Sequence, residues 1–452
     1  MGTSAVSAYE EELELPCPRG DTGLLAHLAA GIAARIDPAL VPVRLAVARS
    51  GPDGYSCEIG VVAGLPEAAR DRVRSIFEFR RRRAESTSSF TTVLLVPTGI
   101  GCAVGGHAGD ANPAAELLAA VSDRLVTHPN VVNASDINEL PRNALYVEGS
   151  VIARFLMGTV GLQPVRSNRV LAVVDDHPDG HFTAAAVKSV SAARASYGLV
   201  SAGVVLLDPP LPVESRWAPS GRATGVVTEL ERLFQVLDER RGEYDAVALS
   251  TQIEVPFSYH LDYYLRRGEM VNPWGGVEAM LTHTVSVLYD VPAAHSPMFE
   301  SKEVAALDPG VVDPRMAAEV ISTGFFMSVL KGLQRSPRLV DVTADRAAPA
   351  GVLTAADVSC LVVPDGAVGL PTLAALDQGI PVVAVRENEN IMENDLGELP
   401  WASAQLITVE NYWEAAGVVA ALRAGIDPAS VRRPLADTET AKASAARTAC
   451  RT

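Results

Sequence analysis

The stretch TTVLLVPTGIGCAVGGHAGDANP, residues 91–113, indicates the fold more directly than any other part of the chain. It opens with a continuous apolar run, which is typical of a strand covered on both faces of a parallel sheet. A turn rich in glycine follows, and residues 113–125 then show the apolar spacing of a helix. This order of strand, turn and helix predicts an α/β unit that binds a ligand at the carboxyl end of its strand.

The same order recurs twice further along the chain. RVLAVVDD (169–176) is a predicted strand that leads through a polar loop to a helix over 182–198. VSCLVVPDG (358–366) leads to a helix over 367–379 and then to another strand, IPVVAVREN (380–388). Strands and helices that alternate at this spacing favour parallel sheets. We therefore expect an α/β fold with doubly wound, Rossmann-like parallel sheets.

Changes in composition divide the chain into five predicted segments. Residues 1–88 are expected to form a small α+β unit, and residues 89–270 an α/β domain that contains the glycine-rich turn. A helical segment over 271–340 precedes a second α/β half over 341–425. Residues 426–452 are rich in Ala, Arg and Thr and are predicted to form a frayed tail.

Charge and cysteine content exclude several classes of protein. The chain has 452 residues and a net charge of −16, whereas nucleic-acid-binding proteins usually present a basic face. A short basic run, residues 79–83, falls in a charged helix predicted over 67–83, and we interpret it as a solvated helix face. The five cysteines lie far apart without a CxxC pair, so neither a disulfide framework nor a zinc ribbon is expected.

The sequence also predicts a cytoplasmic protein without a membrane partner. No apolar run reaches the roughly 18 residues that a membrane-spanning helix needs. The N-terminal stretch, residues 1–20, is acidic and lacks the basic and apolar regions of a secretory signal. Widely spaced cysteines fit a reducing compartment.

The glycine-rich turn is the leading candidate for a ligand-binding loop. Glycine lets the backbone approach a ligand closely, and the N-terminus of the helix that follows favours an anion. The turn lacks the GK[ST] sequence of a Walker loop, and tight backbone packing is the alternative interpretation. Its predicted ligand-binding residues are Thr98, Gly99, Gly101, Gly105, Gly106, His107 and Asp110.

Cys102 lies in the same turn and is a candidate nucleophile or proton carrier. A helix N-terminus lowers the pKa of a nearby thiol and so makes it more reactive. A cysteine among Gly and Ala residues is more often a small core residue, which is the alternative.

Polar side chains also follow the next strand along the chain. His128, Asn130 and Asn133 come directly after the short strand in LVTHPNVVNA. Such side chains are costly to bury without partners, so we expect them to face a cleft. A turn stabilised by the Asn side chains is the alternative.

A cluster of ionisable residues, DDHPDGH (175–181), follows the strand in residues 170–174. Asp176 and His177 are its candidate catalytic residues, because a carboxylate and an imidazole can serve as acid and base. The cluster could also hold a divalent metal, although its spacing matches no standard signature. A solvated loop is the alternative.

Glu278 and His283 are the candidate catalytic residues of the predicted helical segment. They are five residues apart, so they do not share one helical face well. Glu278 lies in the first turn of its helix, where the helix dipole stabilises a carboxylate whether or not it is catalytic.

The last candidates belong to the second α/β half. Asp365, Gly366 and Thr372 surround the turn after a predicted strand, where they would bind a ligand. Arg386 ends the next strand and could hold a carboxylate or phosphate through two hydrogen bonds. A surface ion pair with a neighbouring glutamate is the alternative for Arg386.

Several segments of the chain together resemble one domain-of-unknown-function family, found in cyanobacteria, plastid-bearing organisms and some actinobacteria. The resemblance covers residues from about 90 to 400 and implies a single α/β architecture, without catalytic assignments. It rests on VPTGIGCAVGGHAGDANP, LVTHPNVVNAS, LYVEGSVIARF, NPWGGVEAMLTH, PAAHSPM, DPRMAAEVISTGF and GLPTLAALDQGIPVVAVREN.

These residues predict an enzyme that acts on a small anionic metabolite by acid/base chemistry without a cofactor. Isomerases, racemases and lyases work in this way, and backbone N–H groups would stabilise the oxyanion or enolate. The alternatives are a nucleotide-sugar-dependent glycosyltransferase-like enzyme, a metal-dependent hydrolase and a non-catalytic metabolite sensor. No cofactor is favoured, and a homodimer is the default expectation because symmetric dimers are common.

Overall fold

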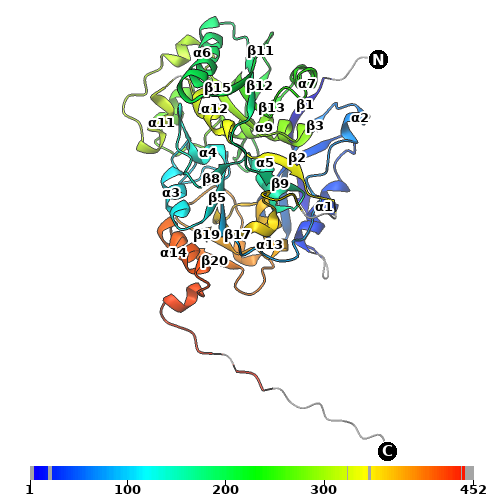
Figure 1. Cartoon of the computed structure of the whole chain (residues 1–452), viewed down its shortest axis with the longest axis vertical. Coiled ribbons are helices and arrows are strands. Elements are labelled where there is room, and N and C mark those ends of the chain that lie inside the picture. Colours follow the sequence, from blue (N-terminus) through cyan, green and yellow to red (C-terminus); the bar gives the residue numbers. More distant parts are fainter. Residues whose placement is uncertain (1–4, 19–22, 323, 345–347, 439, 443–452) are drawn as a thin grey trace, which may run out of the picture.

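The computed structural model of the chain describes residues 5–18, 23–322, 324–344, 348–438 and 440–442. Within them, strands form three larger sheets, of which two are parallel and one is antiparallel, and two small antiparallel pairs. One helix, α9 (Gly275–Tyr289), lies near the middle of the molecule, where it packs against the antiparallel sheet and the small parallel sheet (Figure 1).

The large parallel sheet contains the strand that opens the glycine-rich stretch. α3 (Asn112–Ala120) and α14 (Tyr412–Arg423) cover one of its faces, and α5 (Gly149–Leu156) and α13 (Leu370–Gln378) cover the other. Burial on both faces accounts for the unbroken apolar runs in these strands. In order, the strands are β20 (Leu406–Val409), β19 (Val382–Val385), β17 (Val358–Pro364), β4 (Thr91–Leu94), β5 (Arg124–Thr127) and β8 (Ala144–Tyr146).

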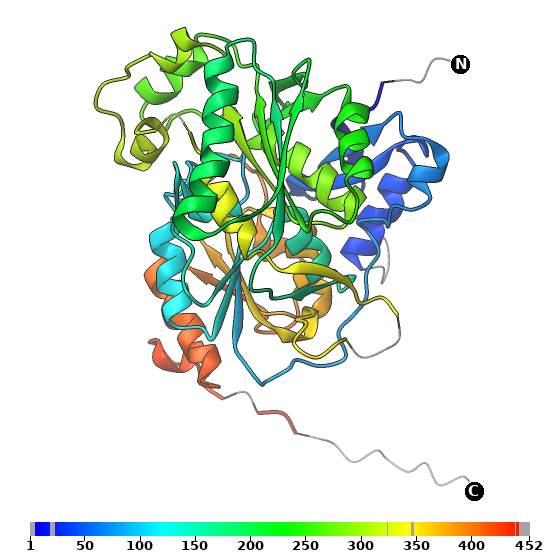
Figure 2. The same ribbon diagram turned by 45° about the horizontal axis from the view of Figure 1, so that its top comes forward.

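The small parallel sheet lies above the large one in Figure 2. α6 (Gly180–Tyr197) and α12 (Phe326–Gln334) pack on one face, while α7 (Leu230–Glu239) and α9 pack on the other. In order, its strands are β11 (Val200–Leu207), β10 (Arg169–Asp175), β14 (Ala246–Gln252) and β15 (Ala293–Met298).

The antiparallel sheet combines strands from three distant parts of the chain. N-terminal strands occupy its centre, and later strands pair with them on either side. α1 (Leu24–Ala33) packs against β1 and α13, and α9 packs across the sheet. In order, the strands are β12 (Val213–Trp217), β13 (Ala223–Val227), β1 (Ser7–Leu15), β3 (Gly54–Ala63), β2 (Val41–Gly51) and β18 (Val368–Gly369).

Short elements complete the described chain. Two antiparallel pairs join β9 (Val160–Gln163) to β16 (Arg338–Asp341), and β6 (Asn133–Ala134) to β7 (Ile137–Asn138). The short helices are α2 (Glu67–Arg70), α4 (Pro129–Val132), α8 (Tyr259–Leu265), α10 (Lys302–Ala305) and α11 (Ala317–Val320). The 3-10 turns are η1 (Pro314–Met316), η2 (Ala355–Asp357), η3 (Leu396–Glu398) and η4 (Pro428–Val431).

The predicted α/β class and its parallel sheets are confirmed, but a Rossmann-like arrangement is not. An extended antiparallel sheet stands beside the parallel ones, with β1, β3 and β2 at its centre. The division into five segments remains a prediction, and part of the tail expected over 426–452 lies outside the described residues.

One local prediction is wrong. The charged helix expected over 67–83 ends at Arg70, and the basic run that follows lies outside any helix or strand. Arg82 donates hydrogen bonds to the Gln378 and Gly379 carbonyl oxygens at the end of α13, so one arginine of this run caps a helix. The helical segment expected over 271–340 contains β15 and β16 as well as helices.

Within the described residues, no helix is both long enough and apolar enough to cross a membrane.

The close approach of α9 to the antiparallel sheet depends on Gly276. A β-carbon at this position would collide with the carbonyl oxygen of Ala223 in β13. On the facing strand, a β-carbon on Gly225 would collide with the Val277 side chain of α9. Helix and strand therefore pack at a distance that only glycine permits.

We expect Gly276→Ala to lower the free energy of unfolding by about 1–3 kcal/mol or more, because the backbone must move to admit the methyl group. Chemical denaturation measures this change. Gly417→Ala is the matched control, since Gly417 lies inside α14 with open space around its Cα, and we expect it to stabilise the protein by about 0.5–1 kcal/mol. Equal effects of the two variants would contradict this account of the packing.

Candidate functional site

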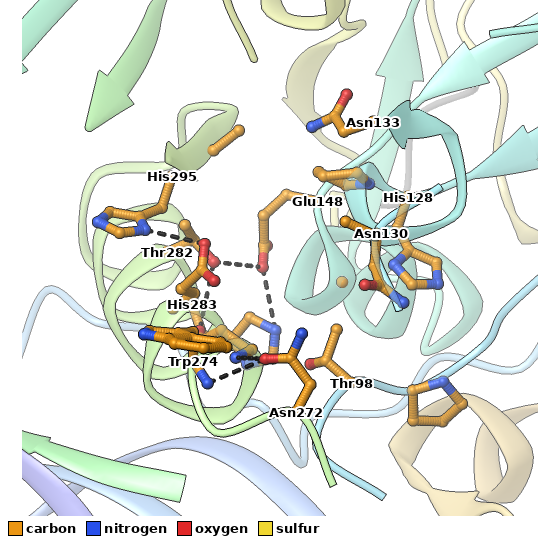
Figure 3. Close-up of a pocket in the computed structure, with 18 of the residues that line it drawn as sticks. Thr98, His128, Asn130, Asn133, Glu148, Asn272, Trp274, Thr282, His283 and His295 are labelled. Carbon is orange, nitrogen blue, oxygen red and sulfur yellow. Dashed lines mark hydrogen bonds and ion pairs between the residues drawn. The ribbon is translucent and has the colours of Figure 1, made fainter. Parts of the chain in front are cut away.

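A cavity of about 290 Å³ lies where the three larger sheets meet (Figure 3). This volume is close to the lower end of the range of small-molecule sites, roughly 300–1,000 Å³. Residues that follow β4, β5 and β8 line it, together with residues of β2, β15 and β18. The N-termini of α5, α9 and α13 also line the cavity. The site therefore combines the carboxyl ends of parallel strands with three helix N-termini.

Glu148 and His283 form a carboxylate–imidazole pair at the wall of the cavity. Glu148 follows β8 and caps α5, where its Oε2 accepts hydrogen bonds from the backbone N–H groups of Ser150 and Val151. Its Oε1 lies 3.0 Å from His283 Nε2 on α9. Burial raises the pKa of Glu148, but His283 and Ser150 outweigh it, so the pKa falls to about 2. Glu148 is therefore a carboxylate that orients His283.

Glycine at position 149 leaves room for this contact. A β-carbon there would lie 3.0 Å from His283 Nε2. The Glu148–Gly149 dipeptide thus lets the imidazole reach the end of α5. His283 Nδ1 is buried and has no partner in the described protein.

A second imidazole and carboxylate pair lines the same cavity. His295 of β15 has its Nδ1 3.0 Å from Glu278 Oε2 on α9. The backbone N–H of Thr251 donates to His295 Nε2 at 3.3 Å. Because Nε2 accepts this bond, the proton of a neutral His295 lies on Nδ1, toward Glu278.

His128 is held as a neutral imidazole. The backbone N–H of Val96 donates to its Nε2 at 3.0 Å. Burial, and secondarily His283, lower the pKa of His128 to about 4, against the opposing effect of Glu148. At neutral pH its proton therefore lies on Nδ1, which is free to donate a hydrogen bond.

Glu319 of α11 supplies a second carboxyl group, whose pKa is raised where that of Glu148 is lowered. Burial raises its pKa to about 7, against the hydrogen bond that Ala108 N–H donates to Oε1 at 2.7 Å. Asn272 Nδ2 donates to the same oxygen at 3.2 Å. Its Oε2 is buried without a partner in the described protein. Glu319 is thus partly protonated near neutral pH.

The structure brings seven of the predicted site residues to this cavity. They come from four separate segments of the chain, and Figure 3 labels most of them. They are Thr98, His128, Asn130, Asn133, Glu278, His283 and Thr372.

Most of the glycine-rich turn does not line the cavity, because other parts of the protein bind its backbone. Asp110 accepts hydrogen bonds from the N–H groups of Gly105 and His107. Asn388 both accepts from Val104 N–H and donates to the Val104 carbonyl, each at 2.8 Å. The predicted residues Gly99, Gly101, Gly105, Gly106, His107 and Asp110 are not among the residues that line the cavity.

Cys102 is buried away from the cavity lining. Burial raises the pKa of its thiol far above the ordinary value, with a smaller contribution from Asp110. A thiol in this setting stays protonated at neutral pH. The structure therefore places Cys102 as a small core residue.

Asp176 and His177 do not reach the cavity either. His177 Nδ1 accepts from Asp179 N–H at 2.9 Å, and its ring packs edge-on against Phe182. This loop forms the start of α6. Within the described residues, no group of three His, Cys, Asp or Glu side chains is placed to hold a metal ion.

The remaining candidates lie outside the cavity lining. Arg386 forms a surface ion pair with Glu410 at 2.8 Å. A surface ion pair was the alternative interpretation of Arg386, although the glutamate differs from the neighbours considered. Asp365 and Gly366 form a turn in which the Asn390 side chain donates to the Asp365 carbonyl oxygen.

The sequence-based prediction missed several polar residues of the cavity. Glu148 had a usable signal, since it follows a strand and precedes a glycine and a helix, as an N-cap residue does. Nothing local distinguishes the others, because their function depends on contacts with distant segments. They are Arg44, Ser150, His260, Asn272, Thr282, His295 and Glu319.

Comparison with known proteins places the chain in a family. A family model described as a protein of unknown function (DUF3326) matches residues 91–432. The chain belongs to this family. The match confirms the resemblance noted in the sequence and includes most of the residues that line the cavity. No solved structure matches the chain.

A relative from Synechococcus sp. is 36% identical over 349 residues, which are 76% of this chain and 93% of the relative. It is named an uncharacterised lipoprotein. This finding contradicts the cytoplasmic location expected from composition and cysteine spacing, because neither property reports on attachment of a lipid. The cytoplasmic prediction is therefore withdrawn.

Glu319 predicts a pH dependence of stability. Its pKa is about 7 in the folded protein and near 4.3 in an unfolded chain. The folded state therefore holds the proton more tightly, so its contribution to stability is complete below pH 4 and is lost as the pH rises to about 7. We expect Glu319→Gln to reduce this loss, by at most on the order of 3 kcal/mol.

Denaturation at pH 5 and at pH 8 measures the effect in the wild type and the variant. Other titrating groups are shared by both proteins, so they cancel in the difference. The surface variant Glu139→Gln is the control and should behave as the wild type does. An equal loss of stability in the wild type and in Glu319→Gln would contradict the raised pKa.

Proposed function

We propose that the protein is an enzyme that moves a proton on a small anionic molecule without a cofactor, as isomerases, racemases and lyases do. The observation that best supports this proposal is that two His–Glu pairs and a partly protonated carboxyl group line one cavity. Groups whose environments separate their pKa values are suited to act as base and acid.

In this proposal His283 is the base. Glu148 lies beside Nε2 and favours the proton there, which leaves a lone pair on Nδ1. When Nδ1 takes a proton from a carbon of the substrate, the ionised Glu148 stabilises the imidazolium that forms. The same relation between carboxylate and imidazole supports general-base catalysis in hydrolases.

Glu319 is the matching acid. It gives a proton to the substrate while His283 takes one, so the total number of protons on the protein is unchanged. A pKa near 7 keeps part of the Glu319 population protonated at neutral pH.

Neutral His128 would stabilise the intermediate. Removal of a proton next to a carbonyl group places negative charge on the carbonyl oxygen. A neutral imidazole whose Nδ1–H faces that oxygen can donate a hydrogen bond to it without supplying a proton of its own.

Hydrogen exchange with solvent tests this function without knowledge of the natural substrate. The probes are short-chain β-keto and α-hydroxy carboxylic acids in D2O, and ¹H NMR follows the loss of the carbon-bound hydrogen. We expect exchange above the enzyme-free rate for at least one probe. His283→Asn and Glu148→Gln should each lower that rate by about a hundredfold or more, the usual range for loss of a general base.

His181→Asn is the matched control, because His181 is exposed and lies outside the cavity lining. It should leave the rate of exchange unchanged. Exchange in His283→Asn at the wild-type rate would refute the role of His283, and exchange with no probe would refute the proposed reaction class.

A further inference from the structure

Arg44 is a cation at the cavity without a carboxylate partner. It lies in β2 and lines the cavity. Its guanidinium donates to the carbonyl oxygens of Gly276 at 3.3 Å and of Thr98 at 3.4 Å. Within the described residues it forms no ion pair. Since arginine has five N–H donors, these two long hydrogen bonds leave much of its capacity unused.

Three acidic side chains influence Arg44: two of them are already bound to another arginine, and the third, Glu148, pairs with His283. Arg222 is fully buried and forms ion pairs with both Glu10 and Glu58. Burial, followed by repulsion from Arg222, lowers the pKa of Arg44 to about 10. Arg44 therefore remains cationic at neutral pH and is the charged group of this region that is available to an anion.

The N-terminus of α13 lies beside the strand that carries Arg44. In the antiparallel sheet, Gly369 of β18 pairs with Ala46 of β2, two residues from Arg44. A β-carbon on Gly369 would approach the Leu45 carbonyl oxygen to 3.0 Å, so the two segments are in close contact. No side chain caps α13, and residues 369–372 at its start line the cavity. A helix N-terminus adds to the attraction that Arg44 exerts on an anion.

Two features of the cavity limit the charge and the shape of that anion. Glu148 is ionised, with a pKa of about 2, and it would repel the second charge of a phosphate group. Much of the remaining lining is apolar, and includes Ile253, Met298, Phe299, Phe325, Val329 and Met392. A ligand that fits has one negative charge at one end and an apolar body.

We infer that Arg44, together with the N-terminus of α13, binds the carboxylate of a small monocarboxylic acid whose apolar chain occupies the rest of the cavity. This inference rests on the proposed function, because it names the substrate class on which His283 and Glu319 would act. Arg44 is a binding residue that acts on the carboxylate and takes no proton.

Calorimetric titration of the full chain with hexanoate, hexanamide and inorganic phosphate tests the inference. We expect hexanoate to bind at least tenfold more tightly than hexanamide, and phosphate to bind more weakly than hexanoate. Arg44→Gln should weaken hexanoate binding by tenfold or more and leave hexanamide binding nearly unchanged. Arg49→Gln is the matched control, because Arg49 lies on the same strand with an exposed side chain.

Arg44→Lys is a second variant in case Arg44→Gln does not fold, which circular dichroism would reveal. It keeps the charge but loses the two-pronged geometry, so hexanoate binding should weaken by a smaller factor. Equal affinity for hexanoate and hexanamide, tighter binding of phosphate, or no binding of any probe would each overturn the inference. So would hexanoate binding that neither Arg44 variant weakens.

The outcomes also separate this inference from the proposed function. Binding of hexanoate that depends on Arg44, without hydrogen exchange on any keto or hydroxy acid, would leave the ligand class standing and remove the catalysis. Exchange that depends on His283, with a KM that Arg44→Gln leaves unchanged, would support the catalysis and remove the role of Arg44 in binding.

Discussion

The contact between α9 and β13 is the constraint on which the rest of the structure depends. Gly276 and Gly225 remove the two β-carbons that would hold this helix away from the antiparallel sheet. On its other sides α9 packs against β15 of the small parallel sheet and against α5, which covers the large parallel sheet. It therefore contacts two of the larger sheets and a helix that covers the third. Every residue of α9 is buried or half-buried, as expected for a helix in the core of a large protein. The helix in turn places Glu278, Thr282 and His283 in the cavity.

Burial raises the pKa of both carboxyl groups of the cavity, but the net shifts are opposite because the partners of the two groups differ. Glu148 has an imidazole and the N-terminus of a helix beside it, which together outweigh the cost of removing a charge from water. Glu319 has one backbone N–H and one amide, and burial dominates. An ionised and a partly protonated carboxyl group can therefore coexist in one cavity at neutral pH.

The sequence predicts the parts of this protein that local patterns determine. Continuous apolar runs such as residues 91–96 identify buried parallel strands, and polar residues after those strands include His128 and Asn130 of the cavity. The glycine-rich turn shows where such reasoning ends. Its backbone is bound by Asn388, which is 284 residues away in sequence, and no local pattern reports that partner. Arg44 was missed for a similar reason, since its strand belongs to a sheet that only the folded chain assembles.

The region that the family model matches does not contain the whole antiparallel sheet. The match begins at residue 91, yet β1, β3 and β2 lie between β13 and β18 in that sheet. A chain that began at residue 91 would keep β13 and β18 but lose every strand that connects them. β13 would keep only β12 as a partner and become an edge strand, β18 would lose its partner, and α9 would lose part of the sheet that covers it. Residues 43–46 of β2 line the cavity, so a strand outside the region that the family model matches forms part of the cavity wall.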